Sequence, residues 1–213
     1  MPAEKAEPQK FSPFGVFLRP KKTVLAAITS PKPAYAGAFI FLAWLFWVFS
    51  AMLLETSTDA LFFGKALAAD LIILLVFCVL AFIAAKAAKS KVGFSGILTA
   101  YSLTKMLEAV FFVIIVLALV SVPNIGPKAQ GFQDTANNAV MEELFSSLTS
   151  SPLGLALAVI GTVALLWFSI LYFYISFLTV HNSAKISAFK SIVLLLVFLA
   201  VCAIASTVVG NFL

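Results

Sequence analysis

The chain alternates long apolar runs with short polar segments. Five runs supply close to the roughly 20 consecutive apolar residues that a helix needs to cross the hydrocarbon core of a bilayer. The predicted spans are residues 35–54, 67–85, 97–122, 153–180 and 192–209. The third and fourth exceed this minimum, so we expect either to tilt or to extend into water. The pattern predicts an all-α fold, a polytopic membrane protein with a five-helix transmembrane bundle over residues 35–213.

Residues 1–34 form a basic segment, rich in proline and phenylalanine, ahead of the first span. Pro20 can begin a short helix there, and the Ser-Pro pair at residues 30–31 can end it. The apolar face of this helix would comprise Val24, Leu25 and Ile28. We expect an interfacial helix that is basic on its polar side. For residues 1–12, an unstructured tail is an equal alternative.

The one long connection, residues 123–152, contains a second predicted short helix. Asp134 can cap it, and apolar residues recur after Asp134 at the spacing of one helical face. We expect this face to lie on the outer membrane surface or over the bundle, in preference to acting as a gate.

Composition supports the membrane assignment. Of the 213 residues, 62% are hydrophobic and only 11% are charged, and the mean hydropathy is +1.10. A soluble domain is nearer half apolar and about a quarter charged, so this class is excluded. Cys78 and Cys202 lie inside apolar runs, where cysteine behaves as a small hydrophobic residue.

Lysine and arginine are distributed unequally between the two sides of the predicted topology. Most of the 14 lie in the N-terminal segment and in the connections after the second and fourth spans. The opposite side has only Lys65 and Lys128. This bias predicts a cytoplasmic N-terminus and an external C-terminus. It also predicts contact with anionic lipid headgroups at the cytoplasmic face, and it gives no indication of nucleic-acid binding.

Three ionisable residues within the spans are candidate functional residues, because charges inside a bilayer are costly. Asp70 lies three residues into the second predicted span, which favours a capping or interfacial role at a helix N-terminus. Lys105 and Glu108 are three residues apart on the third span and can pair. We expect Lys105 to reach toward the cytoplasmic boundary while Glu108 lies deeper. A structural ion pair and a proton- or cation-handling carboxylate are equal alternatives for Glu108.

His181, the single histidine, lies where the fourth span meets its cytoplasmic connection. A polar contact at the helix end is a more common role for such a residue than ligand binding. The sequence lacks HExxH, GxSxG, Walker and GxGxxG motifs, and one histidine does not provide the usual metal ligand sets. We therefore expect no enzymatic activity, no cofactor and no metal.

Three short stretches and the order of the spans resemble the Yip domain family. The stretches are Phe17-Leu18-Arg19-Pro20, Ala100-Tyr101-Ser102-Leu103-Thr104, and the eleven residues from Val180 to Lys190. Eukaryotic members of this family are membrane proteins that interact with Ypt/Rab GTPases. The chain departs from the family at Lys105, where a proline is common, and in its short N-terminal segment. The resemblance implies a prokaryotic plasma-membrane relative to which Rab binding does not transfer.

The resulting expectation is a non-enzymatic scaffold or adaptor that acts in membrane organisation, trafficking or complex assembly. Its partners would be the lipid bilayer, a membrane protein or a second copy of the chain. The alternative is a small solute or ion transporter, or a channel subunit, that uses Glu108 and Lys105.

Overall fold

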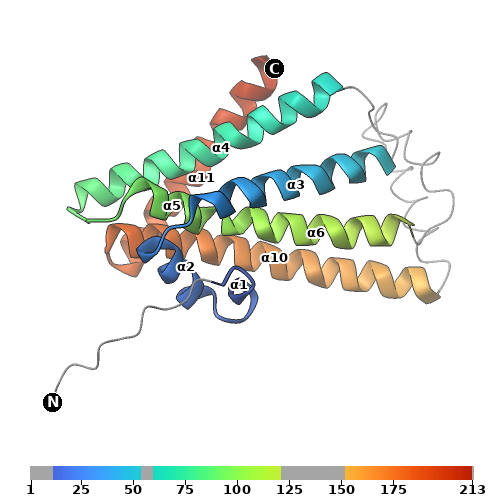
Figure 1. Ribbon diagram of the computed structural model, residues 1–213, viewed down its shortest axis with the longest axis horizontal. Coiled ribbons are helices and arrows are strands. Elements are labelled where there is room, and N and C mark those ends of the chain that lie inside the picture. Colours follow the sequence, from blue (N-terminus) through green and yellow to red (C-terminus); the bar gives the residue numbers. More distant parts are fainter. Residues whose placement is uncertain (1–11, 54–59, 121–151, 213) are drawn as a thin grey trace.

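The computed structural model describes residues 12–53, 60–120 and 152–212. Within these residues every regular element is a helix (Figure 1). The helices are α1 (Gly15–Leu18), α2 (Pro20–Thr29), α3 (Pro33–Leu53), α4 (Ala60–Ala87), α5 (Phe94–Tyr101), α6 (Leu103–Val120), α10 (Pro152–Ala184) and α11 (Ala188–Phe212). The predicted all-α fold class is confirmed.

Five stretches are long and apolar enough to cross a membrane, as the sequence predicted. They are Pro33–Ser50 in α3, Phe63–Ala87 in α4, Phe94–Ile114 in α5 and α6, Val159–Ala184 in α10, and Ala188–Ala205 in α11. The protein is a multi-pass membrane protein. With 28 residues in α4 and 33 in α10, both helices exceed the minimum for a span, so they tilt or their ends leave the hydrocarbon core.

The outer faces of α10 and α11 carry large apolar side chains that no other part of the described chain covers. Val163, Leu166 and Ile170 of α10 and Leu196 and Ile204 of α11 are 60% to 64% exposed. In water such a continuous apolar surface would promote aggregation, whereas lipid chains cover it at no cost. These faces form part of the lipid-facing surface of the bundle, to which exposed apolar side chains of α3 and α4 also contribute.

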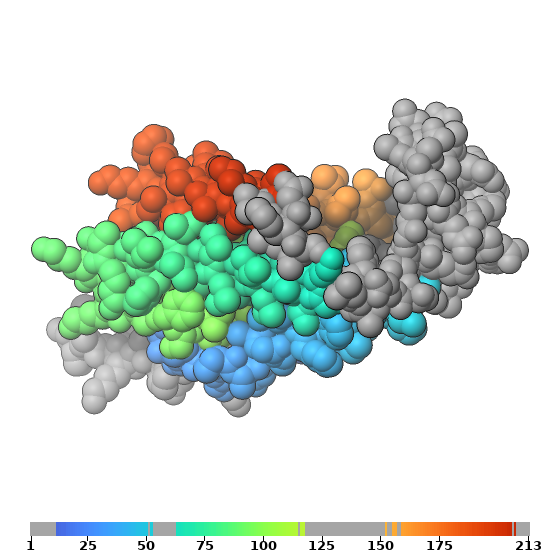
Figure 2. Space-filling view, turned by 90° about the horizontal axis from the view of Figure 1, so that it is seen from above, coloured from blue at the N-terminus to red at the C-terminus, as the bar shows by residue number. Residues whose placement is uncertain are grey.

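The helices do not pack in simple chain order. α3 lies along α6, and α4 lies against α10 and α11. In Figure 2, α4 is flanked by α11 on one side and by α3 on the other. The described residues include two buried apolar clusters, one with residues of α2 and α6 and the other with residues of α4 and α11. α10 contributes Ile175 to the first and Val180 to the second, and so connects the two clusters.

The third span is interrupted at Ser102, where the sequence predicted one helix over residues 97–122. Ser102 Oγ donates to the carbonyl of Thr99 at 2.9 Å, and Thr104 Oγ1 donates to the carbonyl of Tyr101 at 2.7 Å. The amide of Lys105 bonds to the carbonyl three residues back, at 3.0 Å, which is the tighter 3₁₀ pattern. Local hydroxyl-to-carbonyl bonds of this kind bend helices, so α5 ends and α6 begins here.

At the end of the bundle where α10 is followed by α11, α1, α2 and α5 lie together and form what we call the collar (Figure 1). α2 has the predicted bounds, but its apolar face contacts α5 and α10 and thus lies on protein. Val24 and Ile28 are buried as expected, whereas Leu25 is 42% exposed and Ala27 takes its place on the buried face. Residues 24, 27 and 28 lie on one side of a helix, and residue 25 is turned about 100° from residue 24.

Two other predictions have different outcomes. α4 begins at Ala60, seven residues before the predicted start of the second span, because a helix continues through an exposed lysine such as Lys65. The predicted helix after Asp134 and the alternatives for the N-terminal tail up to residue 11 lie outside the described residues.

Candidate functional site

Lys105 is shared between two carboxylates inside the bundle. Its Nζ lies 2.5 Å from Asp70 Oδ1 and 2.7 Å from Glu108 Oε2. Within residues 12–53, 60–120 and 152–212, these are the only ion pairs. We call Asp70, Lys105 and Glu108 the charge triad.

The triad combines a local pair with a tertiary contact. Lys105 and Glu108 are one turn apart on α6, so the predicted pair between them is confirmed. Asp70 comes from α4, and it lies roughly 15 Å from the start of that helix at Ala60. The prediction that Asp70 sits at a helix N-terminus is therefore wrong, because α4 begins a further two turns earlier than the apolar run indicated.

The three members of the triad differ in exposure. The Lys105 side chain is 8% exposed, whereas those of Asp70 and Glu108 are 34% and 31% exposed. Lys105 therefore turns inward to the carboxylates and does not reach for the membrane boundary as expected. With all three groups ionised, the triad carries one net negative charge, and the exposed parts belong to the carboxylates.

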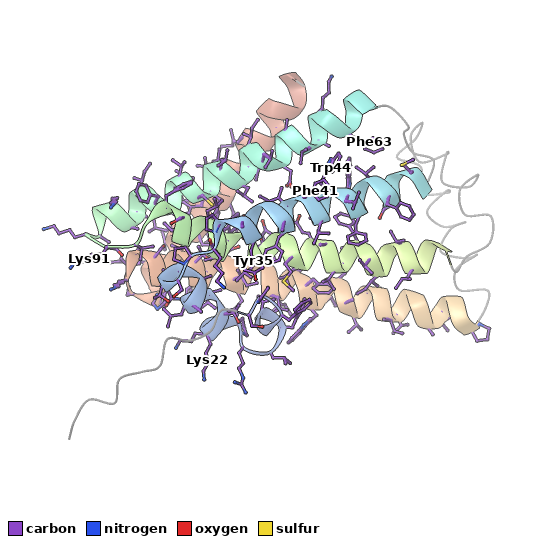
Figure 3. The ribbon with its side chains drawn as sticks, in the orientation of Figure 1. Lys22, Tyr35, Phe41, Trp44, Phe63 and Lys91 are labelled. Atoms are coloured by element: carbon purple, nitrogen blue, oxygen red, sulfur yellow. The ribbon has the colours of Figure 1, made fainter. Side chains whose placement is uncertain are left out.

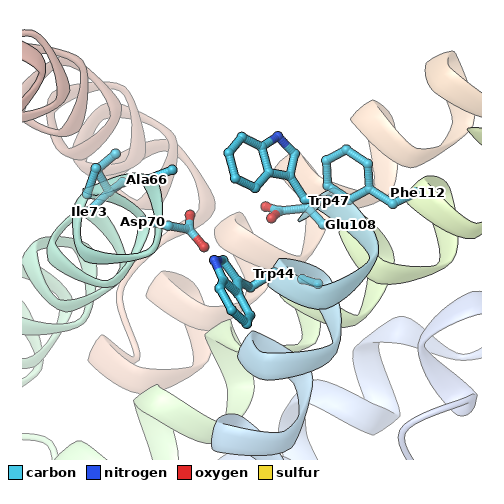
Figure 4. A pocket seen from close by; sticks show the side chains of 9 residues that line it. Trp44, Trp47, Ala66, Asp70, Ile73, Glu108 and Phe112 are labelled. Atoms are coloured by element: carbon cyan, nitrogen blue, oxygen red, sulfur yellow. The ribbon is translucent and has the colours of Figure 1, made fainter. Parts of the chain in front are cut away.

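Both carboxylates line a cavity of about 330 Å³, which we call the tryptophan cavity. Its walls come from α3, α4 and α6, and they are mostly apolar. Figure 4 shows Asp70 and Glu108 on facing walls, with Trp44 and Trp47 beside them. Trp44 Nε1 donates to the carbonyl of Phe63 at 3.2 Å. Trp47 makes an edge-to-face contact with the ring of Phe63, so both tryptophans pack against α4.

Glu108 also lines a second cavity of about 330 Å³, on the side of α6 that faces α10. Tyr172 lines this second cavity, and its hydroxyl lies 2.8 Å from that of Tyr101. Tyr101 in turn stacks on Phe77 of α4, with 3.8 Å between ring centroids. Glu108 thus lies between the two cavities. The hydrogen bond between Tyr172 and Tyr101 links the second cavity to α5 of the collar.

His181 lies apart from the triad, near the turn between α10 and α11. Its Nδ1 is 3.1 Å from Ser191 Oγ, and its ring stacks on that of Phe177. These contacts join the ends of two neighbouring helices, in keeping with a polar contact at the helix end.

The chemistry available at the triad is ionic. In the part of the chain that the structure describes, no group of three His, Cys, Asp or Glu side chains could hold a metal ion. Two carboxylates and one ammonium can bind a cation, release it or exchange a proton. Sequence reasoning found all three residues, but it placed Asp70 too near the start of its helix to connect it with Lys105.

Comparison with known proteins adds no assignment. No protein-family model, no curated protein and no solved structure matches this chain. Membership of the Yip family therefore stays a prediction.

Proposed function

We propose that this chain is a non-enzymatic transport protein that moves protons across the membrane through the charge triad. The observation that carries the proposal is that one buried ammonium is shared by two carboxylates, with Glu108 facing a cavity on either side of α6.

A purely structural ion pair would need only one carboxylate. Lys105 and Glu108 are neighbours on α6 and already neutralise each other. Asp70, which also accepts a bond from Lys105, brings the triad to one net negative charge, and charge within a membrane span is costly. A carboxylate within a membrane span that faces a cavity is typical of the proton relays of pumps and transporters.

Proton flux in liposomes tests this function. The reconstituted protein would be exposed to a potassium diffusion potential, and a trapped pH-sensitive dye would report proton entry. We expect flux well above that of protein-free liposomes, and a loss of about tenfold or more in Glu108→Gln and in Asp70→Asn, because neither amide can exchange a proton. Lys65→Gln, which removes an exposed lysine of α4, should keep the wild-type rate. Flux that equals the protein-free leak, or that persists in Glu108→Gln, would overturn the proposal.

The second candidate is the Yip-like scaffold or adaptor, and the distribution of exposed cations favours it. Lys22 on α2 and Lys91 before α5 lie toward the collar end of the bundle, whereas Phe63 lies toward the opposite end (Figure 3). Exposed cations at or beside the collar, and at the helix ends next to it, are Arg19, Lys21, Lys22, Lys32, Lys86, Lys89, Lys91, Lys185 and Lys190. On this proposal the collar faces the cytoplasm of a prokaryotic cell and contacts anionic lipid and a membrane partner.

Binding of a fluorescent phosphatidylglycerol to the detergent-solubilised protein tests the lipid contact. We expect the quadruple variant with glutamine at positions 21, 22, 89 and 91 to bind up to about a thousandfold more weakly, because four surface lysines at about 1 kcal/mol each contribute about 4 kcal/mol. Lys65→Gln is the matched control and should bind as the wild type does. Equal binding by the quadruple variant would contradict the lipid contact.

A capture experiment in mild detergent tests the scaffold itself. Recovery of neither a specific partner nor a homo-oligomer would count against the scaffold.

A further inference from the structure

The tryptophan cavity has more apolar wall than a proton pathway requires. Trp44 and Trp47 of α3 and Phe112 of α6 supply three aromatic side chains, and α4 adds Ala69 and Ile73. In Figure 4 the carboxylates of Asp70 and Glu108 lie between these aromatic groups. The same space therefore offers both negative charge and aromatic surface.

The volume of the cavity argues against a bare ion. At about 330 Å³, it equals roughly ten waters at about 30 Å³ each, and it lies in the range of small-molecule sites. A metal ion would need a shell of several oxygen ligands. Among the residues that line the cavity, only Asp70 and Glu108 carry side-chain oxygens. A small inorganic cation would be poorly coordinated here.

The charge of the site selects a cation over an anion. Lys105 is 8% exposed and already donates to both carboxylates, so its ammonium is not available to an anionic ligand. The carboxylates are about four times as exposed, at 34% and 31%, and one net negative charge remains. A monovalent cation in the cavity would neutralise the triad.

The tryptophans specify the kind of cation. An indole ring is the best aromatic partner for an organic ammonium, which it attracts through the negative face of the ring. Apolar walls favour a ligand with an apolar body, because its burial releases water from both surfaces. The geometry thus combines the two features that recognise an aromatic or alkyl quaternary ammonium.

We propose that the tryptophan cavity binds a monovalent lipophilic organic cation, which lies against Trp44 and Trp47 and forms an ion pair with Asp70 and Glu108. The inference deepens the proposed function, on which it rests, because the organic cation and the proton share the same two carboxylates. While the organic cation occupies the cavity, Asp70 and Glu108 form an ion pair with it and do not take up a proton. The organic cation and the proton therefore compete for the same site.

Tryptophan fluorescence tests the binding directly. The chain has 3 tryptophans, and the third, Trp167, is 52% exposed on α10, so Trp167→Phe leaves a signal from the cavity alone. The probe is 1-benzylpyridinium, a monovalent aromatic cation whose pyridinium ring quenches indole fluorescence. We expect saturable quenching that benzyltrimethylammonium reverses and that neutral benzyl alcohol at the same concentration does not.

Two variants separate charge recognition from shape. Glu108→Gln should weaken binding about tenfold, because an ion pair with the ligand is lost. Ala69→Leu keeps the triad and narrows the cavity, so it should also weaken saturable quenching, in this case without the loss of a charge. Lys65→Gln should leave the binding curve unchanged, and circular dichroism would confirm that each variant is folded. Linear, unsaturable quenching, or equal reversal by benzyl alcohol, would overturn the inference.

Failure of this inference can be told apart from failure of the proposed function. Proton flux without saturable binding of 1-benzylpyridinium would overturn the organic-cation site and leave the proton pathway standing. Saturable binding without proton flux would overturn the pathway. When both hold, 1-benzylpyridinium should slow the proton flux at the concentrations where it saturates the fluorescence signal, and an unaffected flux would contradict the shared carboxylates.

Discussion

Lys105→Met is expected to destabilise the protein by about 2–4 kcal/mol. Removing one partner of a buried ion pair typically costs about 3–5 kcal/mol, because the other charge stays buried without compensation. Here the loss leaves Asp70 and Glu108, each of which accepts a bond from Lys105, facing each other as like charges. The expected cost is somewhat below that range because each carboxylate side chain is about a third exposed. Unfolding in detergent, followed by circular dichroism, measures the change.

Lys65→Met is the control, because it makes the same change at an exposed lysine and should shift stability by no more than about 0.5 kcal/mol. The triple variant Asp70→Asn, Lys105→Met, Glu108→Gln should recover most of the lost stability, because it removes every charge of the triad. It should still conduct no protons, which separates the structural role of the triad from its proposed function. A Lys105→Met protein as stable as Lys65→Met would show that the triad does not hold α4 against α6.

Gly96→Ala is expected to cost about 1–3 kcal/mol and to release α2 from the collar. A Cβ atom at Gly96 would lie 2.7 Å from the carbonyl oxygen of Ile28 and 3.3 Å from its Cα. Both are backbone atoms, so α2 as a whole must move, and overpacking of this kind typically has such a cost. Limited digestion with trypsin measures the effect, since Lys21 and Lys22 are exposed on α2 and a docked helix resists cleavage.

Gly37→Ala and Gly161→Ala are matched controls. Both glycines lie in helices, α3 and α10, and a Cβ atom at either would meet nothing within 4 Å. Alanine is the better helix former by about 1 kcal/mol, so neither change should destabilise the protein or speed cleavage at α2. Cleavage of Gly96→Ala at the wild-type rate would mean that α5 can accommodate the methyl group without loss of the collar.

Local sequence signals determined the helices of this protein. In a bilayer each backbone amide and carbonyl must find a partner within its own segment, so a long apolar run implies a helix. The start of α2 at Pro20 and of α10 at Pro152 follow from the fixed φ of proline, which suits the first turn of a helix. The contact between Lys105 and Glu108 could also be predicted locally, because residues three apart lie on the same face of a helix.

The break at Ser102 and the true start of α4 could not be read from hydrophobicity. The break depends on hydroxyl-to-carbonyl bonds that Ser102 and Thr104 make to carbonyls three residues back, in the last turn of α5. A count of apolar residues does not detect such bonds. Lys65 interrupts the apolar run, but it does not interrupt the backbone bonds of α4. The distance of Asp70 from the start of its helix was misjudged as a result.

Tertiary structure alone decided what surrounds the charges. Asp70 meets Lys105 across 35 positions of the chain, and Ile28 meets Gly96 only because α2 folds back on α5. The tryptophan cavity needs α3, α4 and α6 together. The sequence by itself determined a helical membrane protein with three costly charges in its spans, because helix formation and insertion depend on local composition. Which charges share one site, and which cavity they face, depends on how helices distant in the chain pack.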